Sequence, residues 1–268
     1  MKKTALVLAV ILAAAFLFSG CVTVSVNDGG KENTEKKTFT VGFDAEYPPY
    51  GYMDDNGDYT GFDLELAEKV CEMEGWELVK KPINWDSKDM ELNSGAIDCI
   101  WNGFTMDGRE DDYTFSKPYV DNSQVIVVAE SSGITDLAGL DGKKVGVQAG
   151  SAALALFEED GGQYELGATF ASLDQFADYN TAFTELLAGA LDGLAIDIAV
   201  AQYQIENRGE GFVILDEYLN SEKYAVGFKK GDTELAEIIN KDMKALYDDG
   251  TLMELAEKYG IADMVIAQ

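Results

Sequence analysis

The chain contains no histidine and only two arginines, Arg109 and Arg208. Histidine is the commonest general base and a frequent ligand of transition metals. Its absence excludes the Ser-His and Cys-His pairs that activate a nucleophile, and any metal centre built on imidazole. The composition therefore favours a protein that works without such a catalytic centre, and we expect neither a cofactor nor a metal ion.

Basic residues are also scarce. The sequence has 20 Lys and Arg against 49 Asp and Glu, which gives a formal net charge of −29. Nucleic acids and anionic lipid surfaces attract proteins of the opposite charge, so neither is an expected partner. The acidic residues are spread along the chain without a long acidic block, which is typical of a solvated surface.

Cysteines number three, Cys21, Cys71 and Cys99. In an exported protein the last two could form a disulfide. Cys71 lies in a helix-like run and Cys99 in a strand-like run, and we favour two buried thiols over a disulfide.

The N-terminus carries the one extended apolar run, from Ala5 to Phe18, behind Lys2 and Lys3. A membrane-spanning helix needs about 20 apolar residues, so this shorter run is typical of a secretory signal. Ser19-Gly20 before Cys21 resembles the bacterial lipobox, in which the cysteine is lipidated and becomes the mature N-terminus. An uncleaved anchor helix is the alternative. We expect an exported, membrane-anchored protein, on a Gram-positive cell surface rather than in a Gram-negative periplasm.

Strand-like and helix-like runs alternate through the rest of the chain, which predicts an α/β fold with mostly parallel sheets flanked by helices. The individual predictions include a strand over Ala168–Ala171 and helices over Phe62–Glu74, Gln175–Ala188 and Thr233–Asp248. Polar breaks near Glu130–Gly133 and Asp216–Glu222 indicate two crossings between two lobes. The predicted organisation is a signal peptide (1–20), a lipidated Cys21 with a flexible tether (21–37), a first lobe (38–129 plus 222–268) and a second lobe (130–221).

Arg109 lies in a polar loop between an apolar strand-like run and a Pro-Tyr turn. A guanidinium can hold a carboxylate with two parallel hydrogen bonds, which a lysine cannot do. Asn102, Gly103 and Thr105 just upstream are of the kind that fix a small polar ligand. A solvated surface arginine is the alternative, and no second cation that would suit a dicarboxylate is evident around Arg109.

Six segments occur in a characteristic order: DAEYPPY from Asp44, GFDLELAEKV from Gly61, SGAID from Ser94, GFTMDGRE with FSKPY, GKKVGVQAGS from Gly142, and LDGLAID ending at Asp197. Together they resemble the solute-binding proteins of bacterial amino-acid ABC transporters. The resemblance implies a two-lobed fold of the type II periplasmic-binding-protein class.

The resemblance also implies binding roles for particular residues. Arg109 would hold the α-carboxylate of an amino acid, in a cradle completed by Asn102, Gly103 and Thr105. Asp197 would accept from the α-ammonium, although it could instead be a helix N-cap. Trp101 fits a pocket wall or the core equally well. The remaining implied ligand-binding residues are Gly150 and Ser151 as backbone donors, Tyr47 and Trp85 around the ligand side chain, and Asp44 as a second acceptor.

The leading hypothesis is a lipid-anchored, monomeric receptor that closes its lobes on a neutral polar or cationic amino acid and delivers it to an ABC permease. One alternative is an exported cyclohexadienyl (prephenate or arogenate) dehydratase, because some relatives with this fold are enzymes. A sensor domain acting through a separate partner is another.

Overall fold

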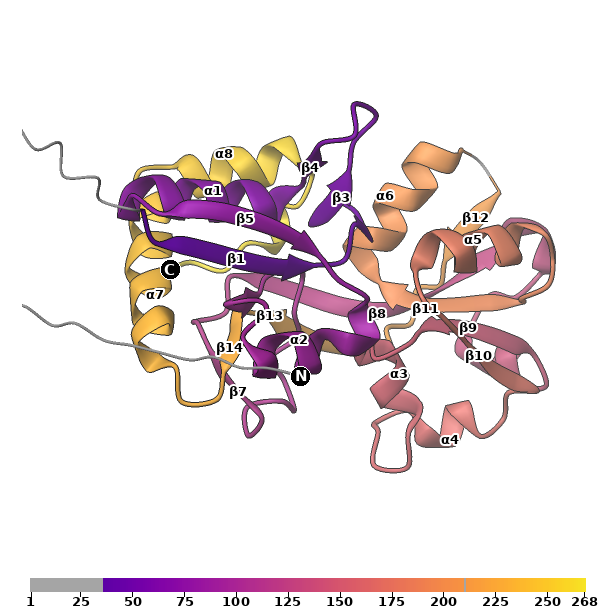
Figure 1. Cartoon of the computed structure of the whole chain (residues 1–268). Helices are drawn as coiled ribbons and strands as arrows, with labels where there is room; N and C mark the ends of the chain where they lie inside the picture. Colours follow the sequence, from indigo (N-terminus) through magenta and orange to yellow (C-terminus); the bar gives the residue numbers. More distant parts are fainter. Residues whose placement is uncertain (1–35, 210) are drawn as a thin grey trace, which may run out of the picture. The chain divides into compact units, whose positions relative to one another are not determined.

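The computed structural model describes residues 36–209 and 211–268, and Lys36–Gln268 forms one compact unit (Figure 1). The predicted signal peptide, the lipidated Cys21 and the tether up to residue 35 lie outside the described residues. None of the helices in the described part of the chain has the length and apolar character needed to cross a membrane.

The first lobe is built on a five-stranded sheet in the order β5-β1-β6-β14-β7. β1 runs parallel to β5 and β6, whereas β14 is antiparallel to β6 and β7. Phe39, Val41 and Phe43 alternate along β1 with their side chains fully buried. The strands are β1 (Thr38–Phe43), β5 (Glu77–Pro82), β6 (Cys99–Ile100), β7 (Tyr113–Phe115) and β14 (Gly227–Lys229).

The second lobe is built on a six-stranded sheet in the order β10-β9-β11-β8-β12, with β13 also paired to β8. β9 is parallel to β10 and β11, and β8 is antiparallel to its three neighbours. The strands are β8 (Val120–Ala129), β9 (Lys144–Gln148), β10 (Ser172–Phe176), β11 (Gly193–Asp197), β12 (Phe212–Ile214) and β13 (Asn220–Tyr224). A separate three-stranded sheet consists of β2 (Glu46–Tyr47), β3 (Gly51–Met53) and β4 (Tyr59–Thr60).

Helices cover both sheets. On the first sheet, α1 packs against β1 and β5, α2 against β1 and β6, and the C-terminal α7 and α8 pack on α1. On the second sheet, α3 and α5 pack against β9 and β11, and α6 against β8 and β11. The α-helices are α1 (Phe62–Glu74), α2 (Lys88–Ser94), α3 (Ala152–Phe157), α4 (Tyr164–Gly167), α5 (Tyr179–Leu187), α6 (Ile198–Arg208), α7 (Thr233–Asp248) and α8 (Thr251–Lys258). Short 3-10 helices are η1 (Trp85–Ser87), η2 (Glu130–Ser132), η3 (Leu137–Leu140) and η4 (Ala262–Met264).

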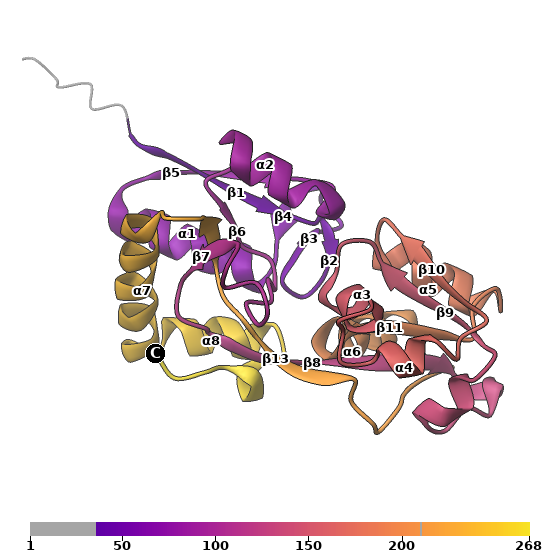
Figure 2. The same cartoon turned by 90° about the horizontal axis from the view of Figure 1, so that it is seen from below.

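Two strands join the lobes. β8 and β13 run side by side between the two groups of helices in Figure 2, with Tyr224 opposite Val120 and Asn220 opposite Gln124. At one end of this ribbon, Tyr224 and Thr105 form an isolated bridge, which ties it to the first lobe. At the other end, β8 continues into the second sheet through β11 and β12. The lobe boundaries at 129/130 and 221/222 stay a prediction.

The predicted α/β class and two-lobed fold agree with the structure, but both sheets are mixed rather than mostly parallel. Strands that return through the crossing ribbon or close a hairpin run against their neighbours, and apolar patterns carry no information on strand direction. The predicted strand over Ala168–Ala171 and helix over Gln175–Ala188 are also misplaced along the chain. β10 occupies 172–176, and α5 begins only at Tyr179, where the Asp178 side chain accepts from the Thr181 N–H as an N-cap.

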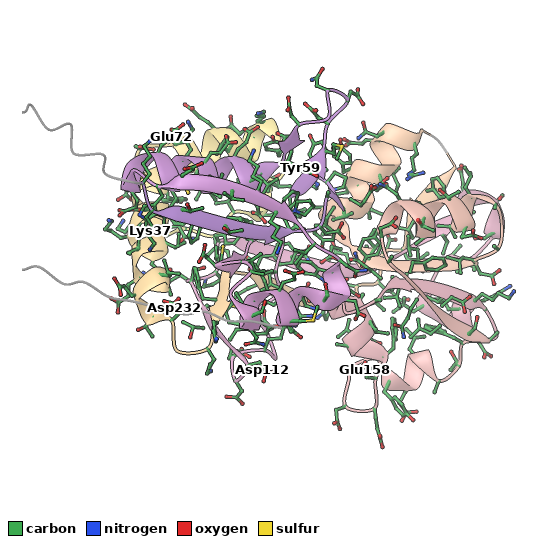
Figure 3. All side chains as sticks on the ribbon, in the orientation of Figure 1. Lys37, Tyr59, Glu72, Asp112, Glu158 and Asp232 are labelled. Atoms are coloured by element: carbon green, nitrogen blue, oxygen red, sulfur yellow. The ribbon has the colours of Figure 1, made fainter. Side chains whose placement is uncertain are left out.

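The acidic surface and the two thiols follow the sequence predictions. Glu72, Asp112 and Glu158 are exposed and point outward in Figure 3. Cys71 on α1 and Cys99 on β6 are both buried free thiols. Burial raises the pKa of Cys71 to about 12 and that of Cys99 well above its usual value, so neither is an activated nucleophile.

Candidate functional site

The predicted binding residues lie where strands end in both lobes. Asp44 follows β1 and Asn102 follows β6 in the first lobe, while Gly150 follows β9 and Asp197 ends β11 in the second. In open α/β sheets ligands bind outside the carboxyl ends of parallel strands. The fold thus brings residues from four separate segments to one region between the lobes.

Contacts between the lobes occur at this region. Gln148 donates from Nε2 to Oδ2 of Asp44 over 2.6 Å, and Lys88 donates from Nζ to the carbonyl of Gly150 over 2.9 Å. Asn180 hydrogen-bonds to Glu46 nearby. Residues of the first lobe therefore touch residues of the second directly.

Arg109 has a guanidinium without an acidic partner. Its Nη1 donates to the Thr105 carbonyl over 3.2 Å, and its Cζ lies 4.9 Å from the centre of the Phe104 ring. Within the described residues, no carboxylate oxygen lies within 4.0 Å of its side-chain nitrogens. The arrangement leaves donors of the half-buried fork available to an anion.

Lys88 is a second cation at the site, and sequence reasoning missed it. Its side chain comes from the first turn of α2, the residue is only 6% exposed, and its Nζ also lies 3.4 Å from the Trp85 carbonyl. Burial, and next the charge of Arg109, lower the pKa of Lys88 to about 8. The expectation of no second cation around Arg109 is therefore wrong. A lysine in an amphipathic run gives no sequence signal that separates it from a surface lysine.

The carboxylate of Asp197 is buried and lies among neutral donors. Its Oδ1 accepts from Asn122 Nδ2 over 2.7 Å, from Gln124 Nε2 over 2.6 Å, and from the Tyr224 hydroxyl. Burial, followed by the negative charge of Glu222, raises the pKa of Asp197 to about 6. Asp197 stands at the N-cap position of α6, but its side chain makes no capping bond, so the N-cap alternative does not account for it.

Asp44 is a second buried carboxylate. It accepts from the Glu46 N–H over 2.9 Å as well as from Gln148, and burial raises the pKa of Asp44 to about 6. Neither Asp44 nor Asp197 has a Lys or Arg nitrogen within 4.0 Å among the described residues. The region between the lobes thus holds charges of both signs that do not neutralise one another by direct contact.

The first-lobe cradle is fixed by internal hydrogen bonds. Asn102 Oδ1 accepts from the Asp44 N–H over 2.8 Å, and the Gly103 N–H donates to Oδ2 of Asp63 over 2.6 Å. Gly103 has φ +55°, and a Cβ there would lie 2.9 Å from the Tyr47 ring, so only glycine fits. Asp63, on α1, is another residue that sequence reasoning missed. Because the Asp63 carboxylate accepts from the Gly103 N–H, this donor is not free for a ligand.

Two aromatic rings face one another beside the cradle. The Tyr47 and Trp85 ring centres are 6.4 Å apart with 8° between the planes, and each residue is 7% exposed. Nearly parallel rings have the orientation in which a flat group can stack against them. Trp101 is fully buried in the main core, which resolves its ambiguity in favour of packing.

Gly150 and Ser151 connect β9 to α3. Ser151 caps α3 by accepting from the Leu154 N–H over 3.1 Å, and its own N–H donates to the Gln148 carbonyl over 3.3 Å. Gly150 has φ +67°. The hydroxyl and the N–H of Ser151 are therefore both engaged within the second lobe.

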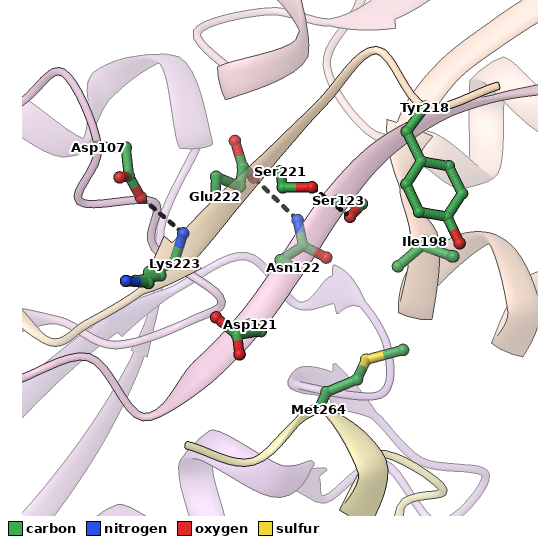
Figure 4. A pocket seen from close by; sticks show the side chains of 10 residues that line it. All are labelled: Asp107, Asp121, Asn122, Ser123, Ile198, Tyr218, Ser221, Glu222, Lys223 and Met264. Carbon is green, nitrogen blue, oxygen red and sulfur yellow. Dashed lines mark hydrogen bonds between the residues drawn. The ribbon is translucent and has the colours of Figure 1, made fainter. Parts of the chain in front are cut away.

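A cavity of about 520 Å³ lies against the crossing strands, and Figure 4 shows side chains that line it. Asp121 and Ser123 of β8 and Ser221 and Lys223 of β13 contribute to it, with Met264 from η4. None of the predicted ligand-binding residues lines this cavity. Its lining also includes Asn122, which donates to Asp197, so the cavity borders the region where those residues meet.

Comparison with known proteins agrees with this geometry. The family model described as bacterial extracellular solute-binding proteins, family 3, matches residues 39–262. The L-cystine-binding protein TcyJ of Escherichia coli (strain K12) is 31% identical over 256 residues, covering 94% of each chain. The arginine-binding extracellular protein ArtP of Bacillus subtilis (strain 168) is 31% identical over 252 residues, covering 91% of this chain and 95% of its own.

A solved structure also aligns over most of the chain. It is an ABC uptake transporter substrate-binding protein from Streptococcus pneumoniae with bound histidine, with a TM-score of 0.81 and 37% identity, covering 85% of this chain and 94% of its own. The two curated relatives are named for the amino acid that each binds, and the pneumococcal uptake protein shares the fold described here. The chain therefore belongs to the bacterial extracellular solute-binding proteins of family 3, as an amino-acid-binding protein of the ABC importer type.

Proposed function

We propose that the chain clamps the zwitterionic part of an L-amino acid between its lobes. The observation that carries this proposal is the set of charges without direct counter-ions: the cations Arg109 and Lys88, and the buried carboxylates Asp44 and Asp197. An uncompensated buried charge costs several kcal/mol. A ligand that brings a carboxylate to the cations and an ammonium to Asp197 would relieve both costs at once. Because the groups come from both lobes, binding would favour the closed form.

The ligand side chain is proposed to be cationic or neutral polar. Asp44 offers a carboxylate to a positive or hydrogen-bonding group, and the parallel rings of Tyr47 and Trp85 suit a flat one. The names of the relatives, which bind arginine, cystine and histidine, support a polar amino acid of this kind.

Delivery to a membrane permease and anchoring through lipid on Cys21 complete the proposal. The ABC uptake context of the pneumococcal relative supports a permease partner. The Ser19-Gly20-Cys21 sequence supports lipidation, and acyl chains add roughly 0.8 kcal/mol of membrane affinity per buried CH₂. We further propose a monomer that is held outside the cytoplasmic membrane, on a Gram-positive cell surface.

The test is a thermal-shift screen of the compact unit Lys36–Gln268, refolded to remove bound ligand, against the common L-amino acids and L-cystine. A ligand at 100 times its Kd stabilises by about 2.7 kcal/mol, which is readily seen as a higher Tm. Arg109→Lys keeps the charge but removes the fork, so it should abolish most of the shift. The matched variant Arg208→Lys, at the only other arginine, should keep it. Asp197→Asn should also abolish the shift.

A binding role is proposed over an enzymatic one. The relatives named above are binding proteins, and no side chain of the described site is a histidine or an activated thiol. Prephenate and arogenate belong in the same screen because Lys88 lies near Arg109. Turnover of either compound, without a shift from any amino acid, would refute the binding role in favour of the dehydratase alternative.

A further inference from the structure

A compact polar cluster lies where the crossing strands meet the proposed site. It consists of Asp197, Glu222, Asn122 and Gln124, whose side chains all lie 4% or less exposed. Asn122 Nδ2 donates to Asp197 over 2.7 Å and to Glu222 over 2.8 Å. Gln124 Nε2 donates to the same two oxygens over 2.6 and 2.7 Å. Two amide groups thus hold one oxygen of each carboxylate, and Figure 4 shows the Asn122–Glu222 bond between β8 and β13.

Glu222 reaches the first lobe through Thr105. The Thr105 hydroxyl donates to Oε1 of Glu222 over 3.0 Å. A hydroxyl has a single proton, so once that proton points at Glu222, Oγ1 can only accept. A ligand group that meets Thr105 must therefore be a donor, as an ammonium is and a carboxylate is not.

The surroundings contain negative and neutral groups but no cation in contact. The titratable side chains that face the carboxylate pair are the tyrosines Tyr47, Tyr50, Tyr179 and Tyr224, whose pKa values are all raised well above the usual value, chiefly by burial. No Lys or Arg nitrogen of the described residues lies within 4.0 Å of Asp197 or Glu222. Two adjacent buried carboxylates without a cation are unfavourable unless a positive group arrives.

We propose that Glu222, on the strand that joins the lobes, is a positioning residue for the ammonium group of the ligand. It orients the Thr105 hydroxyl as an acceptor, and it shares two amide donors with Asp197 so that the aspartate is held in place. The three bonds to Asp197 all fall on Oδ1, and Oδ2 takes part in none of them. Since Glu222 lies on β13, the ammonium is coupled to the ribbon that must bend when the lobes move. This inference rests on the proposed amino-acid binding.

The experiment is calorimetric titration of the compact unit Lys36–Gln268 with L-arginine, L-histidine and L-cystine from pH 8 to pH 5. Glu222→Gln removes the charge at nearly constant shape. The matched control is Asp121→Asn, which removes an exposed carboxylate in the next residue pair along the two strands, where Asp121 lies opposite Lys223. Because the change removes the charge from these hydrogen bonds, Glu222→Gln should bind the amino acids at least about tenfold more weakly than the wild type at pH 8. Asp121→Asn should stay within about twofold of the wild type.

The pH profile separates positioning from a structural role. Wild-type affinity should fall as the pH drops through about 6, because protonated Asp197 no longer attracts an ammonium. Without the Glu222 charge the carboxyl of Asp197 ionises more easily, so in Glu222→Gln the fall should occur at lower pH. Glu222→Asp keeps the charge and should keep the wild-type midpoint. An unchanged midpoint in Glu222→Gln, or equal affinities of Glu222→Gln and Asp121→Asn, would overturn the inference.

Ligands without the α-ammonium provide a second readout. The deaminated counterparts of arginine and histidine are 5-guanidinopentanoate and 3-(imidazol-4-yl)propanoate. Glu222→Gln should weaken the amino acid but change the deaminated compound less than about twofold, and equal weakening of both would contradict the role. If Glu222→Gln does not fold, Thr105→Val and Thr105→Ser test the same link. Val should bind at least about tenfold more weakly than Ser, and equal affinities would overturn the proposal.

A negative result for the wild type has a different meaning. If neither these three compounds nor any other amino acid of the thermal-shift screen binds the wild-type protein, the proposed function fails, and this inference fails with it. If the wild type binds and only the Glu222 predictions fail, the proposed function stands and Glu222 has a structural role alone.

Discussion

Replacing Lys88 by methionine should make the ligand-free protein more stable and the ligand weaker. The residue is 6% exposed, and burial and Arg109 lower its pKa from 10.5 to about 8. One pKa unit corresponds to 1.36 kcal/mol, so holding the charged ammonium there costs about 3 kcal/mol at pH 7. Methionine removes this cost but also the hydrogen bond to the Gly150 carbonyl, worth about 1 kcal/mol. A net gain of about 2 kcal/mol should raise the Tm by about 4–8 °C.

The pH dependence of the free energy of unfolding tests the same cost of burying the Lys88 charge. The folded pKa of Lys88 lies below the unfolded pKa, so the destabilisation is complete below pH 8 and disappears as the pH rises from 8 to 10.5. The free energy of unfolding of the wild type should therefore approach that of Lys88→Met over this range. Urea unfolding at pH 7, 9 and 10.5 measures it, with Lys144→Met, at an exposed lysine, as the control.

Binding should change in the opposite direction to stability. If Lys88 and Arg109 share the ligand carboxylate, Lys88→Met should weaken the best amino acid of the screen by about tenfold or more, since hydrogen bonds to charged groups contribute about 1.5–3 kcal/mol. A lower Tm of ligand-free Lys88→Met together with an unchanged affinity would contradict both expectations. Lys88 would then be only a structural link to Gly150.

Three further predictions concern neighbouring positions. Burial raises the pKa of Asp63 to about 7, so its ionisation destabilises the fold by about 4 kcal/mol as the pH rises from 3.8 through 7. In Asp63→Asn the free energy of unfolding, measured with urea, should therefore change less between pH 5 and 8 than in the wild type. An unchanged pH dependence would contradict this prediction. Gly150→Ala should hinder lobe closure, because its Cβ would lie 3.1 Å from Lys88 Nζ, whereas Gly142→Ala, with the same φ of +67° and open space, should not. Small-angle scattering of both variants with ligand measures this, and equal radii of gyration would count against a closure role. Trp85→Leu should weaken arginine and histidine more than alanine by about 0.5–2 kcal/mol in calorimetry, and a uniform loss would argue against a flat-group slot.

The sequence alone predicted the helices that bury a continuous apolar stripe. α1 at Phe62–Glu74 and α7 at Thr233–Asp248 begin and end where their periodicity indicates, because local spacing decides which face of a helix is apolar. The order of short motifs was enough to predict the two-lobed fold and a set of polar residues at strand ends. β10 and α5 were misplaced because an apolar segment next to an N-cap is ambiguous until its partner strand, β9, is known.

Only the tertiary structure decided which charged side chains lie together. Lys88, Asp63 and Glu222 are ordinary in sequence, and each is buried only because segments far along the chain cover it. Glu222 meets Thr105 across 117 positions, and Lys88 meets Gly150 across 62. Periodicity reports the local chain, whereas burial and pairing of a charge depend on contacts between distant segments. The sequence therefore determined the fold class and placed several polar residues at strand ends, and the packing of the lobes and the crossing strands decided which charged side chains are buried beside them.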